Sequence, residues 1–216
     1  MNFFRSLLLI AALLPLAAQE PSAYERNSKG WKNLMPKPSL KGWQRGAIPP
    51  ANPLSPETQW KVENGVLVCT GDKGHDWLFY KQDYGDFILH VEWRYTKLDG
   101  NPRYNSGIFV RTPADYSFWY QVQIGSASGG YIFGVGPGEK GPQRFNLQKE
   151  MKEQRVKPAG EWNVTEVIAR GNNIQSWING AVVSELSDCR TPRGRVGLEA
   201  EGFRIEFRKI LLKPVK

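Results

Sequence analysis

The sequence has few of the side chains that build metal and nucleophile sites. It contains two histidines, His75 and His90, in 216 residues. Two histidines exclude a multi-histidine metal cluster. No cofactor is certain, and only a divalent metal held by His90, Glu92 and further carboxylates stays open. Neither a G-x-S-x-G motif nor a Cys/His nucleophile context occurs, which argues against the serine and cysteine nucleophiles that such motifs mark.

Cysteine is equally scarce. Cys69 and Cys189 stand 120 positions apart. An oxidising compartment permits a disulfide between them, whereas a cysteine is as often buried as a small apolar residue. The sequence leaves both alternatives open.

Long hydrophobic runs are confined to the N-terminus. Residues 1–18 combine the basic Arg5, an apolar segment and the small-residue sequence Leu16-Ala17-Ala18, which together predict a signal peptide and export to the periplasm or outside the cell. The apolar segment is too short to span a bilayer, so no membrane span is expected. Residues 19–58 are rich in proline and are expected to pack on a core formed by residues 59–216.

Markers of nucleic-acid binding are also missing. The formal net charge is +8, and a basic protein can meet anionic glycans, membranes or nucleic acid. No helix-turn-helix, zinc-finger or RNA-binding signature accompanies the charge. We therefore expect no nucleic-acid partner, and a solvated basic surface is the simpler interpretation.

Helical periodicity is almost absent, and only residues 146–155 show a weak form of it. Short apolar segments punctuated by Gly, Asn and Pro occur instead, and Asn64-Gly65 and Asn179-Gly180 are typical two-residue hairpin turns. This pattern predicts an all-β antiparallel sandwich. The glycine-rich residues 134–138 precede no helix and are expected to form a loop. The expected strands are 60–62, 66–68, 77–81, 87–95, 106–111, 118–124, 131–134, 163–170, 174–178, 181–184, 196–199 and 203–212.

The strand expected over residues 87–95 alternates clearly. Apolar side chains occupy every second position, and His90, Glu92 and Arg94 share the opposite face. This alternation predicts a strand with one face in the core and one face accessible. The accessible face is either a solvated surface or part of a site.

The strand expected over residues 118–124 places Trp119, Gln121 and Gln123 on one face. Amides hydrogen-bond to hydroxyls and a flat ring stacks on a pyranose, so this face suits a sugar. An exposed tryptophan is also unusual enough to indicate a binding surface. The polar groups are expected to converge on one concave sheet.

Several short motifs occur in the order found in one known family. They run from Leu40-Lys41-Gly42-Trp43 through Glu63-Asn64-Gly65, Tyr84-Gly85-Asp86-Phe87, Glu92-Trp93-Arg94, Asn105-Ser106-Gly107-Ile108-Phe109-Val110-Arg111, Tyr120-Gln121-Val122-Gln123, Gly160-Glu161-Trp162-Asn163, Ile178-Asn179-Gly180 and Gly197-Leu198-Glu199 to Glu206-Phe207-Arg208-Lys209-Ile210. Over about residues 31 to 213 the chain resembles the 3-keto-disaccharide hydrolase domain family. The resemblance implies a jelly-roll sandwich of the concanavalin A-like lectin/glucanase type. It also implies cleavage of 3-keto-glycosides in 3-keto-disaccharides or 3-keto-glucosides, which a sugar 3-oxidoreductase would supply.

A ketone at C3 acidifies the C2 proton, so a base can remove this proton and expel the aglycone from C1, after which water adds back. We expect Glu92 to be the base and either Arg94 or Arg111 to stabilise the enolate oxygen, with Arg111 placed among the catalytic residues. The remaining expected substrate-binding residues are His90, Arg94, Asn105, Trp119, Gln121 and Gln123.

One position departs from the family. Gln121 stands where relatives more often carry glutamate. This change leaves a non-catalytic carbohydrate-binding module of the same fold as the alternative. A retaining glycosidase with two carboxylates is disfavoured, because Gln121 and Gln123 cannot act as nucleophile or acid.

Overall fold

The computed structural model describes residues 19–126 and 128–215. The expected signal peptide, residues 1–18, lies outside the described residues. Within the described ranges, no helix is long and apolar enough to cross a membrane.

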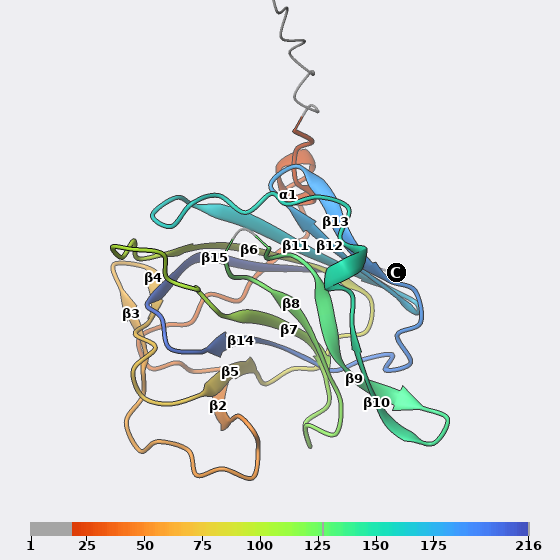
Figure 1. Cartoon of the computed structure of the whole chain (residues 1–216), viewed down its shortest axis with the longest axis horizontal. Helices are drawn as coiled ribbons and strands as arrows, with labels where there is room; N and C mark the ends of the chain where they lie inside the picture. The colour runs from red at the N-terminus through yellow and green to blue at the C-terminus, as the bar shows by residue number, and fades with distance from the viewer. Residues whose placement is uncertain (1–18, 127, 216) are drawn as a thin grey trace, which may run out of the picture.

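Two antiparallel sheets form the molecule and stack as layers (Figure 1). The first sheet has the order β13 (Ala181–Leu186), β12 (Asn173–Ile178), β11 (Asn163–Arg170), β6 (Phe87–Tyr95), β15 (Ile205–Pro214), β4 (Val66–Cys69) and β3 (Trp60–Glu63), with β1 (Lys32–Asn33) also paired to β15. The second sheet has the order β10 (Gly141–Asn146), β9 (Ile132–Gly138), β8 (Trp119–Gln123), β7 (Gly107–Thr112), β14 (Arg195–Ala200), β5 (Asp76–Tyr80) and β2 (Trp43–Ala47). The described helices are α1 (Ala23–Arg26) and a 3₁₀ turn, η1 (Gln148–Glu150).

The all-β sandwich expected from the sequence is confirmed. Both predicted hairpin turns form, since Asn64 and Asn179 adopt φ of 50° and 42°, and Gly65 and Gly180 adopt φ of 77° and 109°. A left-handed backbone of this kind is what a two-residue hairpin requires. The turns therefore fix the registers of the β3–β4 and β12–β13 pairs.

Three local expectations are wrong. Residues 134–138 belong to strand β9 rather than to a loop. Gly134 lies against the backbone of Trp119, and Gly136 lies against the side chain of Tyr120, so a side chain at either glycine would prevent this close pairing. Residues 146–155 contain only the short turn η1. Residues 43–47 form strand β2 inside the proline-rich segment, because Pro36, Pro38, Pro49 and Pro50 lie outside the strand.

The core lies between the two sheets. On β6, Phe87, Leu89, Val91, Trp93 and Tyr95 are each at most 2% exposed, as the alternation predicts. Each fully buried large apolar side chain stabilises the fold by about 1.5–3 kcal/mol. The alternation in the sequence therefore predicts which faces of β6 and β8 pack in the core. The outer faces of the two sheets are the surfaces on which a site can form.

The outer face of β6 is not accessible at His90 and Glu92, contrary to expectation, whereas the side chain of Arg94 is 40% exposed. A segment that we call the N-terminal clasp, residues 22–35, covers it. The Glu166 carboxylate accepts hydrogen bonds from the backbone N–H groups of Ala23 (2.7 Å) and Tyr24 (3.1 Å). The rings of Tyr24 and Trp31 lie against His90, which is 1% exposed. Alternation identified the polar face but could not show that a distant segment covers it.

Candidate active site

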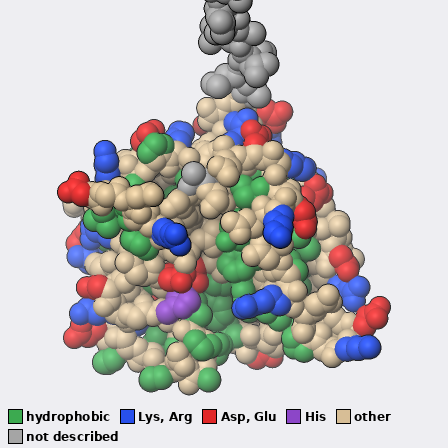
Figure 2. Space-filling view, in the orientation of Figure 1, with side chains coloured by type: hydrophobic (Ala, Val, Ile, Leu, Met, Phe, Trp, Pro, Cys, Tyr) green, Lys and Arg blue, Asp and Glu red, His purple; other side chains and the backbone are tan. Residues whose placement is uncertain are grey.

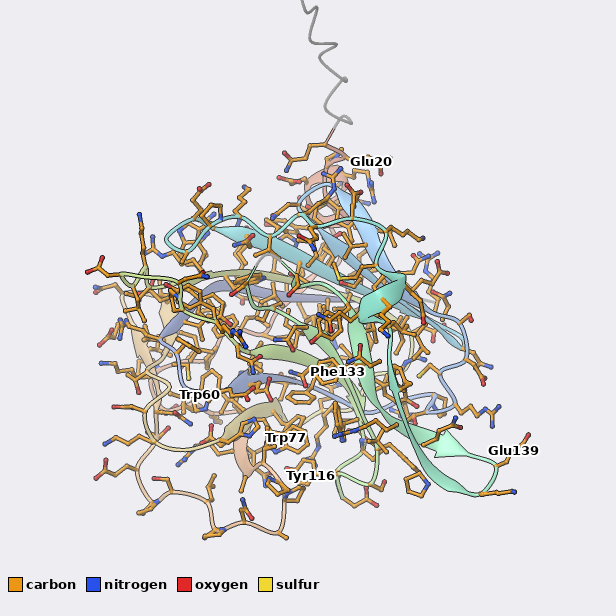
Figure 3. All side chains as sticks on the ribbon, in the orientation of Figure 1. Glu20, Trp60, Trp77, Tyr116, Phe133 and Glu139 are labelled. Carbon is orange, nitrogen blue, oxygen red and sulfur yellow. The ribbon has the colours of Figure 1, made fainter. Side chains whose placement is uncertain are left out.

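A cleft of about 470 Å³ opens on the outer face of the second sheet. Strands β9, β8, β7, β14 and β5 contribute its lining, and residues 48–50, which follow β2, form one wall. Figure 3 labels Trp77, Tyr116 and Phe133, which line this region. In Figure 2 the exposed histidine lies beside acidic side chains at the edge of a hollow with a hydrophobic floor.

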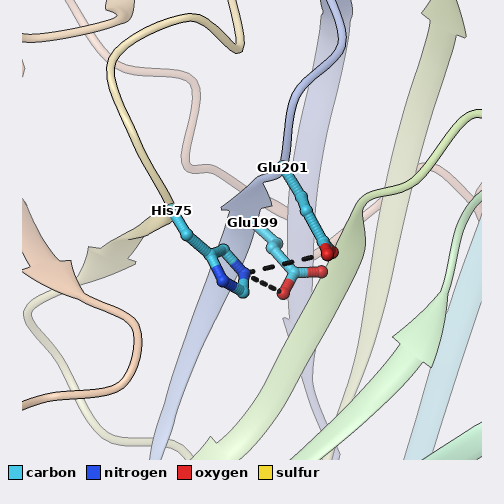
Figure 4. Close-up of side chains that lie close together, drawn as sticks. All are labelled: His75, Glu199 and Glu201. Carbon is cyan, nitrogen blue, oxygen red and sulfur yellow. Dashed lines mark hydrogen bonds and ion pairs between the residues drawn. The ribbon is translucent and has the colours of Figure 1, made fainter.

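One end of the cleft groups a histidine with two carboxylates (Figure 4). His75 immediately precedes β5, Glu199 lies on β14, and Glu201 follows that strand. His75 Nε2 is 2.8 Å from Glu199 Oε1 and 4.0 Å from Glu201 Oε2. The side chain of Glu199 is 6% exposed, whereas those of His75 and Glu201 are 36% and 39% exposed. The buried carboxylate therefore holds the histidine, and the other two groups face the cleft.

Glu199 is itself fixed by Gln121. The side-chain amide of Gln121 donates a hydrogen bond to Glu199 Oε2. Gly107 lies on β7, between the strands that carry these two residues, and a Cβ at this position would overlap the Gln121 amide. The missing side chain opens the path along which Gln121 reaches Glu199.

The two cleft-facing groups have shifted affinities for protons. The hydrogen bond to Glu199 raises the pKa of His75 more than burial lowers it. Burial and the charge of Glu199 raise the pKa of Glu201. A carboxylate of raised pKa is a stronger base than an ordinary one. The pair can accept one proton and donate another.

Amide and hydroxyl groups surround this end. The side-chain amide of Gln123 donates to Asn105 Oδ1, and Tyr131 lines the same region. Burial raises the pKa of Tyr131, and the charges of Glu199 and Glu201 raise it further. Tyr131 therefore stays a neutral hydroxyl at neutral pH, which suits hydrogen bonding to a sugar.

The same trio has the donor set of a metal site. The candidate ligand atoms of His75, Glu199 and Glu201 all lie within 4.8 Å of one another. One imidazole nitrogen and two carboxylates fit a divalent cation such as zinc or a non-haem transition metal. A metal bound here would act as a Lewis acid on a sugar oxygen.

The structure brings four of the eight expected site residues into the cleft. They are Asn105, Trp119, Gln121 and Gln123. The other four, His90, Glu92, Arg94 and Arg111, do not line it.

His90 and Glu92 lie beneath the N-terminal clasp on the first sheet. Glu92 is 4% exposed and receives hydrogen bonds from Lys209 Nζ (2.6 Å) and Arg208 Nε. Burial on its own would raise the pKa of Glu92, but hydrogen bonds from His90, Lys209 and Arg208 lower it to about 2. A carboxylate of such low pKa is a weak base, so the geometry gives Glu92 a structural part.

Arg94 and Arg111 are also held by protein groups. Arg94 Nε donates to Glu206 at 2.8 Å, and its guanidinium lies 4.6 Å from the ring centroid of Trp162. Arg111 is 0% exposed and donates to Asp86 Oδ1 (2.9 Å) and to the backbone oxygens of Gly171 (2.7 Å) and Gly85 (3.2 Å). Arg111 thus joins β7 to two loops inside the fold.

Sequence reasoning missed His75, Glu199 and Glu201. Glu199 stood within the recognised Gly197-Leu198-Glu199 motif, and His75 lies two residues before Trp77 on the same strand face. No local pattern showed that these segments are neighbours across β5 and β14.

The two cysteines are free thiols, and both are buried. Of the two alternatives left open by the sequence, the structure therefore has the unbridged one.

A depression of about 590 Å³ lies elsewhere, beside Tyr104 and Pro158 at one end of the sandwich. Among its described lining residues, Glu161 is the single carboxylate and there is no histidine. The cleft on the second sheet therefore remains the candidate active site.

Comparison with known proteins agrees with this architecture. Residues 30–213 match the model of a family described as the 3-keto-alpha-glucoside-1,2-lyase-like domain. No curated protein matches the sequence.

Among solved structures, the chain is similar to a putative glycosyl hydrolase from Parabacteroides distasonis, with 16% identity and a TM-score of 0.61 over 92% of this chain and 100% of that one. It is also similar to a β-1,3-1,4-glucanase from a mouse hindgut metagenome, with 12% identity and a TM-score of 0.57 over 86% and 98%. A third similar structure is the carbohydrate-binding module CBM66 from Bacillus subtilis, with 14% identity and a TM-score of 0.56 over 78% and 93%. At these identities the likeness establishes the fold, and the concanavalin A-like sandwich is confirmed.

Proposed function

Because the chain belongs to the 3-keto-alpha-glucoside-1,2-lyase-like family, we propose that it cleaves 3-keto-glucosides by elimination across C1 and C2. The family expected from the sequence is confirmed by the same match. The observation that carries the proposal is the group of His75, Glu199 and Glu201 at the polar end of a cleft large enough for a sugar.

The reaction needs one protein base that acts at C2 of the sugar and one protein acid that acts at the oxygen on C1. Glu201 takes the proton from C2, which the ketone at C3 has made acidic. The C2–H electron pair forms the C1=C2 double bond, and the C1–O bond breaks. His75 gives its proton to the departing oxygen, and addition of water to the enone yields the product of hydrolysis.

The neighbouring residues position these groups. Glu199 orients the His75 ring and stabilises its protonated form. Gln121 holds Glu199 in turn, and an amide in place of the family's more frequent glutamate adds no further negative charge beside Glu199 and Glu201. Gln123 and Asn105 are placed to hold sugar hydroxyls.

A chromogenic assay tests the proposal. The purified protein is given a 3-keto-glucoside with a nitrophenyl aglycone and, separately, the unoxidised parent glucoside. We expect release from the keto substrate alone. Glu201→Gln should lower kcat by about 10²- to 10⁴-fold while binding of the unoxidised glucoside, measured by calorimetry, is retained. A wild-type protein that binds both ligands and releases neither would refute catalysis and favour the carbohydrate-binding module.

Chelation separates the two parts that the trio can play. If turnover survives a chelator, the trio transfers protons directly. If turnover is lost and a divalent cation restores it, His75, Glu199 and Glu201 hold a metal. A matched control, Glu206→Gln on the outer face of the first sheet, should behave like wild type in both experiments.

Two further parts of the proposal concern the setting of the reaction. We propose that the ketone is supplied by an enzyme that oxidises the C3 hydroxyl of a glucoside, because the elimination consumes a glucoside that already carries this ketone. We also propose export through residues 1–18, which N-terminal sequencing of the mature protein tests: a start at Gln19 supports it, and retention of Met1 refutes it.

A further inference from the structure

The cleft changes character along the strands of the second sheet. Its polar end contains His75 and Glu201, followed by a row with Glu199, Gln123 and Trp77. Trp77 is paired with Glu199 across β5 and β14. The next row consists of Phe109, Gln121 and Phe133, which are cross-strand neighbours on β7, β8 and β9. The row after that contains Trp119 and Arg144, which are both paired with Val135 on β9.

Successive rows lie about 7 Å apart, since same-face residues on a strand are two positions apart. The aromatic end therefore begins with the row of Phe109 and Phe133, about 7 Å beyond the row of Glu199. It continues into the next row, which contains Trp119. A glycone held at His75 and Glu201 places its aglycone over Phe109, Phe133 and Trp119.

The aromatic rings form one continuous surface. The centroid of Trp119 is 5.4 Å from that of Phe133 and 6.1 Å from that of Phe109. Trp77 lies 4.6 Å from Phe109 and 4.7 Å from Tyr116. Trp77 and Phe109 are only 3% and 2% exposed, so they support the surface from below, and the partly exposed rings of Tyr116, Trp119 and Phe133 are the ones that a ligand can contact.

This end offers little to a hydroxyl-rich aglycone. The Trp77 indole N–H is buried against Gly46, so it is not accessible to a ligand in the cleft. The amide nitrogen of Gln121 is already engaged by Glu199. A second sugar can stack a C–H face on these rings, but its equatorial hydroxyls then need polar partners at the rim, where Arg144 and Tyr116 are the polar side chains among the described lining residues. An aromatic ring has no such groups and stacks on the same floor.

We propose that the aromatic end of the cleft is an aglycone subsite for an aryl group, which makes aryl glucosides the preferred substrate class. The inference rests on the proposed function, because that function places the glycone at His75 and Glu201 and so directs the aglycone towards the aromatic end. Arg144 completes the subsite at its far edge, because a planar guanidinium stacks on an aromatic ring.

Binding of unreactive ligands tests the subsite without turnover. Dissociation constants are measured by calorimetry for unoxidised phenyl glucoside, cyclohexyl glucoside and a glucosyl-glucose disaccharide. Phenyl and cyclohexyl rings are similar in size and differ in their π-systems. We expect phenyl glucoside to bind about 2- to 12-fold more tightly than cyclohexyl glucoside, and the disaccharide to bind most weakly.

Variants locate the effect. Phe133→Leu keeps apolar bulk and removes the ring, so it should reduce the preference for phenyl over cyclohexyl. Trp162→Ala removes a tryptophan from the outer face of the first sheet, where Arg94 and Arg208 flank it, and should leave the preference unchanged.

Equal affinities for phenyl and cyclohexyl glucoside, or tightest binding of the disaccharide, would overturn the inference even if the keto substrate is cleaved. A phenyl preference that Phe133→Leu leaves intact would also overturn it. Retained phenyl preference without any cleavage would refute the proposed function and support the subsite.

Discussion

Replacing Glu92 with glutamine separates a structural carboxylate from a catalytic one. The sequence predicted Glu92 as the base, whereas the structure surrounds it with His90, Arg208 and Lys209 beneath the N-terminal clasp. Lowering of its pKa from 4.5 to about 2 corresponds to about 3 kcal/mol of stability at neutral pH. The side chains of Arg208 and Lys209 are 43% and 44% exposed, so water screens part of this energy. We expect Glu92→Gln to lose about 2 kcal/mol.

The sign of the pH dependence follows from the direction of the shift. Because the pKa of Glu92 is lower in the folded than in the unfolded chain, its contribution is complete above the unfolded value of 4.5. The contribution is lost as pH falls from 4.5 towards 2. The stability difference between wild type and Glu92→Gln should therefore shrink below about pH 4.5, and it should also decrease as pH rises through the pKa of His90, which Glu92 raises.

Denaturant unfolding followed by tryptophan fluorescence measures the difference. A loss of 2 kcal/mol should also lower Tm by roughly 4–8 °C for a chain of this size. Glu63→Gln is the control, since the pair that Glu63 forms with Lys61 is 45–50% exposed and contributes less than about 1 kcal/mol. Turnover of the keto substrate should be unchanged in both variants. Loss of turnover in Glu92→Gln with wild-type stability would refute this account and restore Glu92 as the base.

Three further predictions concern the rest of the described chain. Gly107→Ala should displace the Gln121 amide from Glu199 and lower kcat about 10-fold, with the folded circular-dichroism spectrum retained; unchanged kcat would show that Gln121 does not position Glu199. Arg111→Met should cost about 1.5–3 kcal/mol in denaturant unfolding, because two backbone oxygens lose their donor while Asp86, whose side chain is 39% exposed, keeps water contacts; a loss below about 1 kcal/mol would contradict the role of Arg111 in joining the loops. Both thiols should resist a thiol reagent in the native protein and react in urea, since both are buried and burial raises the pKa of Cys69 to about 12; rapid native labelling would contradict their burial.

Much of the sandwich could be predicted because strands have a recognisable alternation of apolar and polar residues in the local sequence. The alternation in β6 and β8 and the Asn-Gly turns gave the correct core faces and two correct hairpins. Strand β2 was not predicted because prolines surround it, and only the first part of β9 was predicted because the glycines in its second part are typical of loops. Strand β2 forms because it pairs with β5, and β9 forms because it pairs with β8.

The site was half predictable for a related reason. Glu92 and Glu199 both occupy outward positions on alternating strands, so local sequence does not distinguish them. The N-terminal clasp covers the first, and the cleft exposes the groups around the second. Which polar face stays open depends on contacts between residues far apart in the chain, such as Ala23 with Glu166.

The position of β15 sets the order in which the chain can fold. This strand, the last along the described chain, lies in the middle of the first sheet between β6 and β4. It also receives β1, which is among the first segments to be synthesised. On a ribosome the first sheet cannot close until residue 214 has emerged, so β1 and the β3–β4 hairpin wait for their partner strand until β15 has been made.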